Sequence, residues 1–294
     1  MIEKKTWVDY VFDTFNHLLM AALAFVTLYP FWYVLCASFS DPNLFIRKDF
    51  VLLFKPLGWS LEAYRQCLTP RVMTGYSNTL FYVVAGTMLS MILTFLGAYA
   101  LSRKGWLGKR FITLMIMFTM YFSGGIIAIY LWVEQLGMID TRWAILLPTA
   151  LSTYNMIVMR TAFASVPESL IEAAKLDGAG EFTCLFRIVI PLSQATIAVV
   201  VLFYAVWRWN DWMSATIFLR SADFYPLQIF LREILLTSSA DSIVSTGGNS
   251  VNTTALAEII KYATIVVATV PVLCIYPFIQ KYFVSGVMIG GVKE

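Results

Sequence analysis

Residues 164–194, ASVPESLIEAAKLDGAGEFTCLFRIVIPLSQ, form a polar segment between two long apolar runs. Ser165 and Glu168 have the S-x-x-E spacing of a capping box, which predicts that a helix begins near Val166. Gly178 is a natural stop for that helix, because glycine readily adopts the left-handed conformation that ends many helices. The spacing therefore predicts one short helix within the first half of the segment.

A second short helix is predicted from about residue 180 to residue 190, where Pro191 interrupts it. Two such helices joined by a tight turn form a helix-turn-helix. Because the segment is polar and its flanks are apolar, we expect it to lie outside the bilayer and to dock onto a partner.

The composition of the chain is that of an integral membrane protein. Of 294 residues, 59% are hydrophobic and 13% are charged, and the mean hydropathy is +0.73. A membrane-spanning helix needs about 20 predominantly apolar residues. Six runs meet this requirement, near 14–38, 78–101, 111–133, 143–163, 195–219 and 257–280. We therefore predict an all-α polytopic protein with six transmembrane helices in a single domain, residues 1–294.

The orientation is predicted from the distribution of Lys and Arg in the loops. The loop 102–110, SRKGWLGKR, has four basic residues and no acidic one, so the positive-inside rule places it in the cytoplasm. Both termini and the segment 164–194 are then also cytoplasmic. The loop at about 39–77 on the opposite side has basic residues too, but long loops weigh less in this rule.

A second exposed loop is expected at about 220–256. Its first part, 225–236, is amphipathic enough for a short surface helix, and the part that follows is rich in Ser, Thr, Asn and Gly. Such a loop can contact a partner outside the membrane or serve as a solvated connector. Composition alone favours the connector.

The segment 164–194 resembles the EAA loop of permease subunits in binding-protein-dependent ABC importers. The residues that match the spacing of this loop are Glu172, Ala173, Ala174, Gly178, Ile188, Ile190 and Pro191, and the only departure is Ile190 at a position where leucine is usual. Further stretches at 122–148, 154–163 and 225–235 and the tail YPFIQKYFVSGVMIGGVKE are similar to the carbohydrate branch of the family. Within it the chain resembles the maltose-type second permease and lipoprotein-linked polysaccharide permeases. The resemblance implies the type I ABC importer permease fold.

In that family the EAA segment is a coupling helix that lies in a cleft of the ATPase. The resemblance gives Glu172 the role of pairing with a basic residue of the ATPase. Ala173 and Ala174 are small enough for close approach, and Gly178 turns the chain. The residues expected to couple this subunit to the ATPase are Glu172, Ala173, Ala174, Asp177, Gly178, Ile188 and Pro191, of which Asp177 is the one that can also simply cap the turn.

The resemblance also implies a set of partners. No G-x-x-x-x-G-K-[ST] sequence occurs, so we expect the chain to bind no cofactor and ATP and Mg²⁺ to bind to partner subunits. The expected complex has a second homologous permease as heterodimer partner, two ATP-binding subunits and an extracytoplasmic solute-binding protein, in a bacterial cytoplasmic membrane. The tail from about Lys281 is expected to reach the ATPase pair. No nucleic acid, metal site or catalytic residue is predicted.

A polar cluster interrupts the fifth apolar run and is a candidate for the substrate path. It contains Trp207, Arg208, Asn210 and Asp211. A charge inside the bilayer costs about 3 kcal/mol, so Arg208 and Asp211, three residues apart, are expected to share a helix face and neutralise each other. Trp207 and Asn210 offer the stacking surface and hydrogen bonds that sugars use. An interhelical ion pair at the interface with the second permease is an equally weighted alternative.

The function predicted from these observations is that of an importer permease. It carries an oligosaccharide or polysaccharide fragment inward by alternating access, driven by ATP hydrolysis on partner subunits. An importer of a non-sugar solute is an alternative, because the EAA loop reports the ATPase and not the cargo. An ion-coupled secondary carrier is a weaker alternative, because Asp211 is nearly the only acidic residue in the middle of a predicted span.

Overall fold

A computed structural model describes residues 7–46, 52–105, 107–244, 256 and 258–274 of the chain. The described residues form helices and loops without strands, which confirms the all-α prediction. They divide into two compact units. The central unit spans Pro70–Phe230, and the N-terminal unit combines the described residues up to Thr69 with Leu231–Val270. That the whole chain is one domain stays a prediction.

The N-terminal unit is built around its own small core. Its helices are α1 (Trp7–Ser38), α2 (Pro42–Ile46), α3 (Glu62–Cys67), the part of α14 (Leu227–Val244) from Leu231 onward and the helical residues 258–270. Cys36, Ala37 and Leu53 form one buried apolar cluster, and Ala63 and Ile259 belong to another. The last helix therefore packs against the loops and the short helix that precede Thr69.

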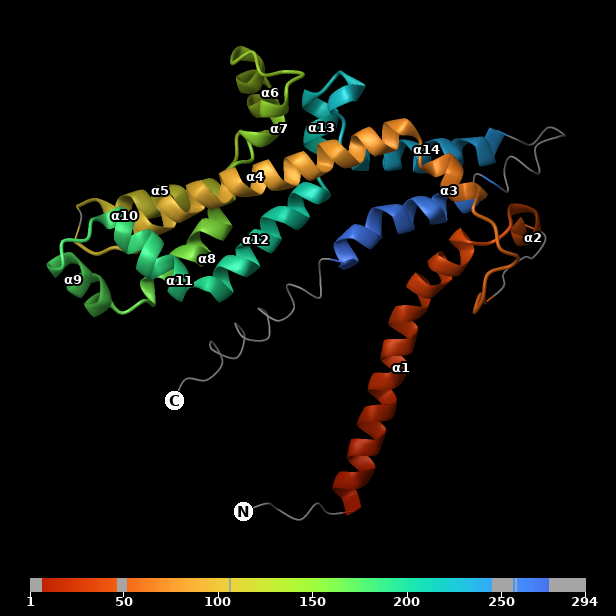
Figure 1. Cartoon of the computed structure of the whole chain (residues 1–294), viewed down its shortest axis with the longest axis horizontal. Helices are drawn as coiled ribbons and strands as arrows, with labels where there is room; N and C mark the ends of the chain where they lie inside the picture. Colours follow the sequence, from red (N-terminus) through yellow and green to blue (C-terminus); the bar gives the residue numbers. More distant parts are fainter. Residues whose placement is uncertain (1–6, 47–51, 106, 245–255, 257, 275–294) are drawn as a thin grey trace. The chain divides into compact units, whose positions relative to one another are not determined.

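The central unit holds most of the helices. They are α4 (Pro70–Ser102), α5 (Lys109–Tyr121), α6 (Gly125–Gln135), α7 (Arg142–Leu146), α8 (Thr153–Ala164), α9 (Glu168–Leu176), α10 (Glu181–Cys184), η1 (Leu185–Val189), α11 (Ile190–Leu192), α12 (Gln194–Trp209), α13 (Met213–Phe218) and η2 (Ala222–Phe224), and α14 (Leu227–Val244) starts here. The long helix α4 packs against α8 and α12, and α5 packs against α8 (Figure 1).

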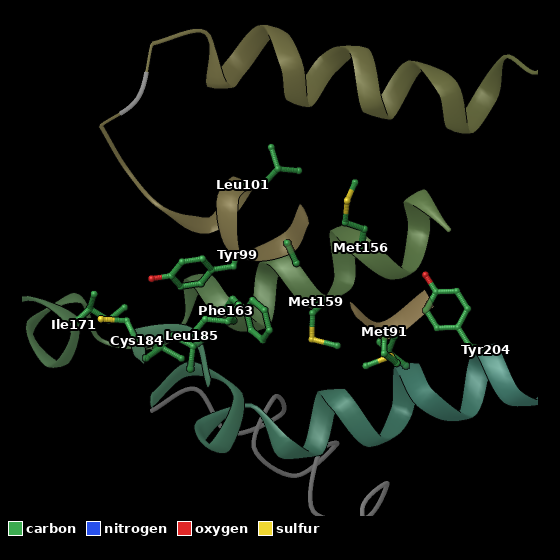
Figure 2. Packing of buried hydrophobic residues seen from close by; sticks show 14 residues of the cluster. Met91, Tyr99, Leu101, Met156, Met159, Phe163, Ile171, Cys184, Leu185 and Tyr204 are labelled. Atoms are coloured by element: carbon green, nitrogen blue, oxygen red, sulfur yellow. The ribbon is translucent and has the colours of Figure 1, made fainter. Parts of the chain in front are cut away.

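A buried apolar cluster joins α4, α8, α12 and the helices of the segment 164–194. Met159 and Phe163 of α8 are fully buried in it, between Met91 of α4 and Leu185 of η1. Figure 2 shows the cluster extending from Ile171 at one end to Tyr204 at the other. Burial of these apolar side chains, each worth about 1.5–3 kcal/mol, holds these helices together.

The count of six membrane spans is not confirmed. Among the described residues two helices are long and apolar enough to cross a membrane, Asp9–Ser38 and Pro70–Ser102. Two bent helix pairs raise the number to at most 4, namely Lys109–Tyr121 with Gly125–Gln135, bent by 109°, and Glu181–Leu192 with Gln194–Trp209, bent by 89°. The apolar run at 143–163 is divided into α7 and α8, and part of the last run lies outside the described residues.

The breaks within these runs have local causes. Gly125 has φ +77°, a left-handed conformation that separates α5 from α6. Pro148 lies between α7 and α8, where its ring and missing N–H oppose helix continuation. The surface helix expected at 225–236 is present as α14, which continues to Val244 into the part predicted to be a polar loop. The remainder of that loop, 245–255, lies outside the described residues.

Two polar side chains fix the loops at one end of the central unit. The carboxylate of Asp140 accepts hydrogen bonds from the backbone nitrogens of Arg220 and Ser221, at 2.9 and 2.8 Å. The side-chain amide of Asn78, on α4, donates to the carbonyl oxygen of Asp223 at 2.6 Å. These contacts hold the chain between α13 and α14 against α4 and the loop before α7.

Candidate functional site

The segment 164–194 folds into the predicted helix-turn-helix. It comprises α9 and α10, with η1 and α11 continuing α10, and it lies at the end of the central unit where α4 is joined to α5 (Figure 1). Gly178 has φ +84°, its backbone nitrogen donates to Lys175 O at 3.0 Å, and Ala179 N donates to Ala174 O at 2.9 Å. This pair of bonds is a Schellman motif, so Gly178 ends α9 as predicted.

The boundaries of the two helices differ from the prediction. The capping box is absent, because Ser165 Oγ donates to Ala162 O and the carboxylate of Glu168 binds Lys104 instead. The helix α9 therefore begins at Glu168 and not near Val166. At the other end, Pro191 does not interrupt the helix, which follows the π-helical turn η1 and continues to Leu192. Proline is tolerated near the start of a helical turn, since its missing N–H has no partner there.

The residues predicted to couple to an ATPase divide between an exposed and a packed side. Glu172 and Ala173 are exposed, as are Asp177 at the C-cap of α9, Gly178 and Pro191. Ala174 and Ile188 are partly buried, and Ala174 packs against the cluster of Figure 2. Ile171, next to Glu172, is only 2% exposed. Because Ile171 faces the core of the central unit, the neighbouring Glu172 lies on the exposed side of α9 and is accessible to a partner.

Large apolar side chains of the same segment are also exposed. Leu176 is 90% exposed, and Phe182 and Phe186 are 68% and 55% exposed. Exposed apolar side chains on a segment that the sequence places outside the bilayer are typical of a protein interface. The segment therefore has the character of a docking surface.

The basic loop 102–110 binds this segment. Lys104 pairs with Glu168 at 2.6 Å, Arg103 Nη2 donates to Phe163 O at 3.0 Å, and Lys109 Nζ donates to Arg103 O at 2.7 Å. The hydrogen bond and charge of Lys104 hold the pKa of Glu168 below its ordinary value. The contact of Lys104 with Glu168 at the start of α9 could not be predicted from the sequence, because no local spacing links the two residues.

A cavity of about 440 Å³ opens between the first turn of α8 and the last turns of α12. Its aromatic lining is Tyr154, Phe203, Tyr204 and Trp207, and its polar lining includes Thr149, Ser152 and Asn155. Exposed aromatic faces beside hydroxyl and amide groups are the combination that binds sugars by stacking and hydrogen bonding. Of the four residues predicted for the substrate path, the cavity wall contains Trp207.

Tyr204 fixes the wall of this cavity. It is 3% exposed, and its hydroxyl is hydrogen-bonded to Thr94 Oγ1 of α4 at 2.8 Å and accepts from Ser152 N at 3.1 Å. Ser152 is the N-cap of α8, and its Oγ accepts from Asn155 N at 3.4 Å. A single hydroxyl therefore connects α4, α8 and α12 at the cavity, a role that the sequence analysis did not predict for Tyr204.

Arg208 lies behind the cavity wall and is 3% exposed. Its guanidinium donates to carbonyl oxygens of Ile145 and Leu146, to the carbonyl and the hydroxyl of Thr149, and to Ser90 Oγ, all at 3.3–3.4 Å. These acceptors come from α4, from α7 and from the turn that follows α7. Arg208 therefore holds three parts of the central unit together.

The predicted ion pair between Arg208 and Asp211 is not formed. Helix α12 ends at Trp209, so Asp211 does not share a helix face with Arg208, and its Oδ1 accepts from Ser214 N at 3.1 Å. Within the described residues Arg208 has no ion pair with a carboxylate. Asn210 is the C-cap of α12, is exposed, and donates to Val206 O at 2.8 Å. Neither Asn210 nor Asp211 lines the cavity.

A glycine of α4 makes room for the arginine. A Cβ atom added at Gly86 would lie 2.5 Å from Arg208 Cδ and 2.7 Å from Arg208 Cζ. Real Cβ atoms do not approach other atoms so closely, so Gly86 is the residue that allows the guanidinium to reach its acceptors.

Comparison with known proteins identifies the family. Residues 86–289 match the family described as "Binding-protein-dependent transport system inner membrane component". The polygalacturonan/rhamnogalacturonan transport system permease protein YtcP of Bacillus subtilis (strain 168) is 39% identical over 288 residues, which cover 96% of this chain and 98% of that protein. Protein LplC of the same organism is 36% identical over 284 residues, covering 96% of this chain and 95% of LplC.

A solved structure shows the same fold. A chain of a bacterial ABC transporter involved in the import of the acidic polysaccharide alginate superposes with a TM-score of 0.82 at 33% identity, covering 95% of this chain and 99% of that one. The resemblance stated from the EAA spacing is thus confirmed, and so is the type I permease fold. The chain belongs to the family of binding-protein-dependent transport system inner membrane components and is a multi-pass membrane permease subunit of an ABC importer.

Proposed function

We propose that this subunit carries an oligosaccharide or polysaccharide fragment with acidic sugar units into the cytoplasm. The observation that carries the proposal is the cavity between α8 and α12, whose wall combines Trp207 and Tyr154 with Asn155. An exposed indole can stack on the apolar face of a sugar ring, and an amide can pair with its hydroxyl groups. One relative is named for polygalacturonan/rhamnogalacturonan transport, and the solved structure is of a transporter involved in the import of the acidic polysaccharide alginate.

The proposed preference for an acidic sugar rests on the N-terminus of α8, which lines the cavity. The first N–H groups of a helix have no partner within it, and they give its N-terminus a partial positive charge. The first turn of α8, with Tyr154 and Asn155, lines the cavity, and no carboxylate is among the lining residues. A sugar carboxylate is therefore more favourable here than a neutral hydroxymethyl group.

The energy for transport comes from partners. In this proposal α9 docks into an ATPase subunit, Glu172 pairs with a basic residue there, and Ala173, Ala174 and Gly178 allow close approach. The exposure of Glu172 and of Leu176 supports this docking. The complex contains a second homologous permease, two ATP-binding subunits that hold ATP and Mg²⁺, and an extracytoplasmic solute-binding protein. The contacts proposed for the tail from about Lys281 lie outside the described residues.

Both termini are cytoplasmic in this proposal. The basic loop 102–110 contacts the segment 164–194 through Lys104 and Glu168, so the two lie on one side of the membrane. The positive-inside rule assigns that side to the cytoplasm.

The complete importer, purified with its partners and reconstituted into liposomes, tests the substrate. Oligogalacturonate and a neutral oligoglucan of equal length are compared by uptake at saturating ATP. We expect uptake of the acidic oligomer, and expect Trp207→Ala and Asn155→Leu each to raise its half-saturating concentration about tenfold. The control is Trp132→Ala, an exposed tryptophan on α6 outside the cavity. Uptake of the neutral oligomer alone, or variants that behave like the control, would contradict the proposal.

The variant Asn210→Leu distinguishes between a role of Asn210 in the substrate path and a role at the interface with the second permease. If Asn210 borders the path, the variant loses uptake while the complex still co-purifies intact. If Asn210 belongs to the interface with the second permease, the complex dissociates.

A further inference from the structure

Glu181 connects the segment 164–194 to the transmembrane helix α4. It is the first residue of α10, just beyond the Gly178 turn. Its Oε1 pairs with Lys175 Nζ of α9 at 2.5 Å, and its Oε2 accepts a hydrogen bond of 2.6 Å from the hydroxyl of Tyr99, in α4. One carboxylate therefore joins three helices.

Tyr99 is the buried member of this group. It is 8% exposed and belongs to the apolar cluster, with Phe163 and Leu185 near it (Figure 2). The guanidinium of Arg103 lies 5.1 Å from the centre of its ring. The ring is thus held by packing, so the position of its hydroxyl, and with it that of Glu181, is defined by α4.

The other polar link between α9 and the region of α4 is weaker. It is the pair of Lys104 and Glu168, whose side chains are 80% and 42% exposed. Exposed ion pairs are screened by water and contribute little, and this holds equally for Lys175 and Glu181, whose side chains are 46% and 54% exposed. The stronger contact of Glu181 is its hydrogen bond with Tyr99. Hydrogen bonds from a neutral donor to a carboxylate are short and strong, and more so beside a buried ring. Contacts of Ile171 with the cluster are apolar and hold α9 by packing alone.

The Gly178 turn makes such a link necessary. The left-handed glycine ends α9 and turns the chain, so α9 and α10 are separate helices whose relative position depends on the contacts between them. The pair of Lys175 and Glu181 spans this turn, and Tyr99 fixes Glu181 to α4. A displacement of α9 then moves α4 along with it.

We propose that Glu181 and Tyr99 are positioning residues that transmit movement of α9 to α4 and so couple ATP hydrolysis to transport. The inference rests on the proposed docking of α9 into an ATPase. Helix α4 packs against α8 and α12, which form the cavity, and its Thr94 binds Tyr204 in the cavity wall. Figure 2 shows Tyr99 and Tyr204 in one apolar cluster, with Tyr204 at one of its ends. The route from docking surface to cavity is therefore continuous within the central unit.

The variants Tyr99→Phe and Glu181→Gln test the inference in the complete importer. Tyr99→Phe removes one oxygen and keeps the ring in the cluster, so folding is retained. We expect the ATPase subunits to co-purify with each variant as they do with the unchanged chain. The number of saccharides moved per ATP hydrolysed should fall about tenfold, because each variant weakens one charge-assisted hydrogen bond. Controls are Tyr121→Phe and Glu134→Gln, both exposed and outside this segment. An unchanged ratio in both test variants would overturn the inference.

A second measurement works without any saccharide. Phe203→Cys places a thiol in the cavity wall. Cys274→Ser removes the thiol that is exposed among the described residues. The rate of maleimide labelling of the new cysteine is then compared with and without ATP. We expect ATP to change this rate, and expect Tyr99→Phe and Glu181→Gln to abolish the change. If ATP changes the rate but no saccharide is moved, the proposed substrate fails and the inference stands. If the change persists in both variants, the inference fails.

Discussion

Gly86→Ala should destabilise the subunit far more than a methyl group in a helix ordinarily does. The new Cβ would lie 2.5 Å from Arg208 Cδ. Arg208 is buried and donates hydrogen bonds to five acceptor atoms. Overpacking costs about 1–3 kcal/mol. Loss of one hydrogen bond of the guanidinium adds about 1.5–3 kcal/mol, and the better helix propensity of alanine returns about 0.5–1 kcal/mol. The free energy of unfolding should therefore fall by about 2–5 kcal/mol.

The assay is the apparent melting temperature of the purified complex in detergent, at a fixed heating rate because unfolding of membrane proteins is often irreversible. The expected decrease is about 5–15 °C. Gly97→Ala is the matched control on the same helix. Its Cβ would meet Met156 Sδ at 2.6 Å, and because the methionine side chain is flexible and makes no hydrogen bond to the described residues that would be lost, its effect should be smaller than that of Gly86→Ala.

A double variant isolates the cause. Gly86→Ala combined with Arg208→Met should cost less than the sum of the two single changes, because methionine removes the clash. If Gly86→Ala melts at the same temperature as Gly97→Ala, the guanidinium is not fixed at α4 and the reasoning is refuted.

Three further changes test other contacts. Tyr204→Phe should lower the free energy of unfolding by about 1–3 kcal/mol, since it leaves buried partners on α4 and α8 unpaired, and the same melting assay measures it. Asp140→Asn should lower the melting temperature at neutral pH. Hydrogen bonds from Ser221 hold the pKa of Asp140 below its ordinary value, so its contribution is fully present above about pH 4, and the difference from the variant should shrink as the pH falls below about 4 and through the lowered pKa. Asn78→Leu removes the bond from α4 to η2, and amide hydrogen exchange of residues 220–227 should become faster; unchanged exchange would show that the bond is not limiting.

Short sequence patterns correctly predicted the parts of the site that depend on neighbouring residues in the chain. The EAA spacing placed α9 and its end at Gly178, because glycine at that position determines the turn within a few residues. The capping box at Ser165 failed, since Lys104, from a distant part of the chain, took the carboxylate of Glu168. A tertiary contact overrode a local preference.

The long-range contacts had no signal in the sequence. Tyr99 and Glu181 are 82 residues apart, and Arg208 reaches Ser90, 118 residues away. Periodicity predicted an intrahelical partner for Arg208 in Asp211, but the helix ends at Trp209, a boundary that hydropathy does not mark. The same limit explains the spans, because an apolar run gives the length of a hydrophobic segment and not the bend at Gly125 or the helix break at Pro148.

The buried arginine also has a consequence for how the protein is made. Before α12 meets its neighbours, the charge of Arg208 makes its entry into lipid unfavourable by about 2.5–3.5 kcal/mol. The groups that relieve this cost are on α4 and in the chain from Ile145 to Thr149, both synthesised earlier. Helix α12 therefore gains a stable place in the bilayer only as it docks, and a chain with a defect at Gly86 should insert less efficiently and yield less of the assembled complex.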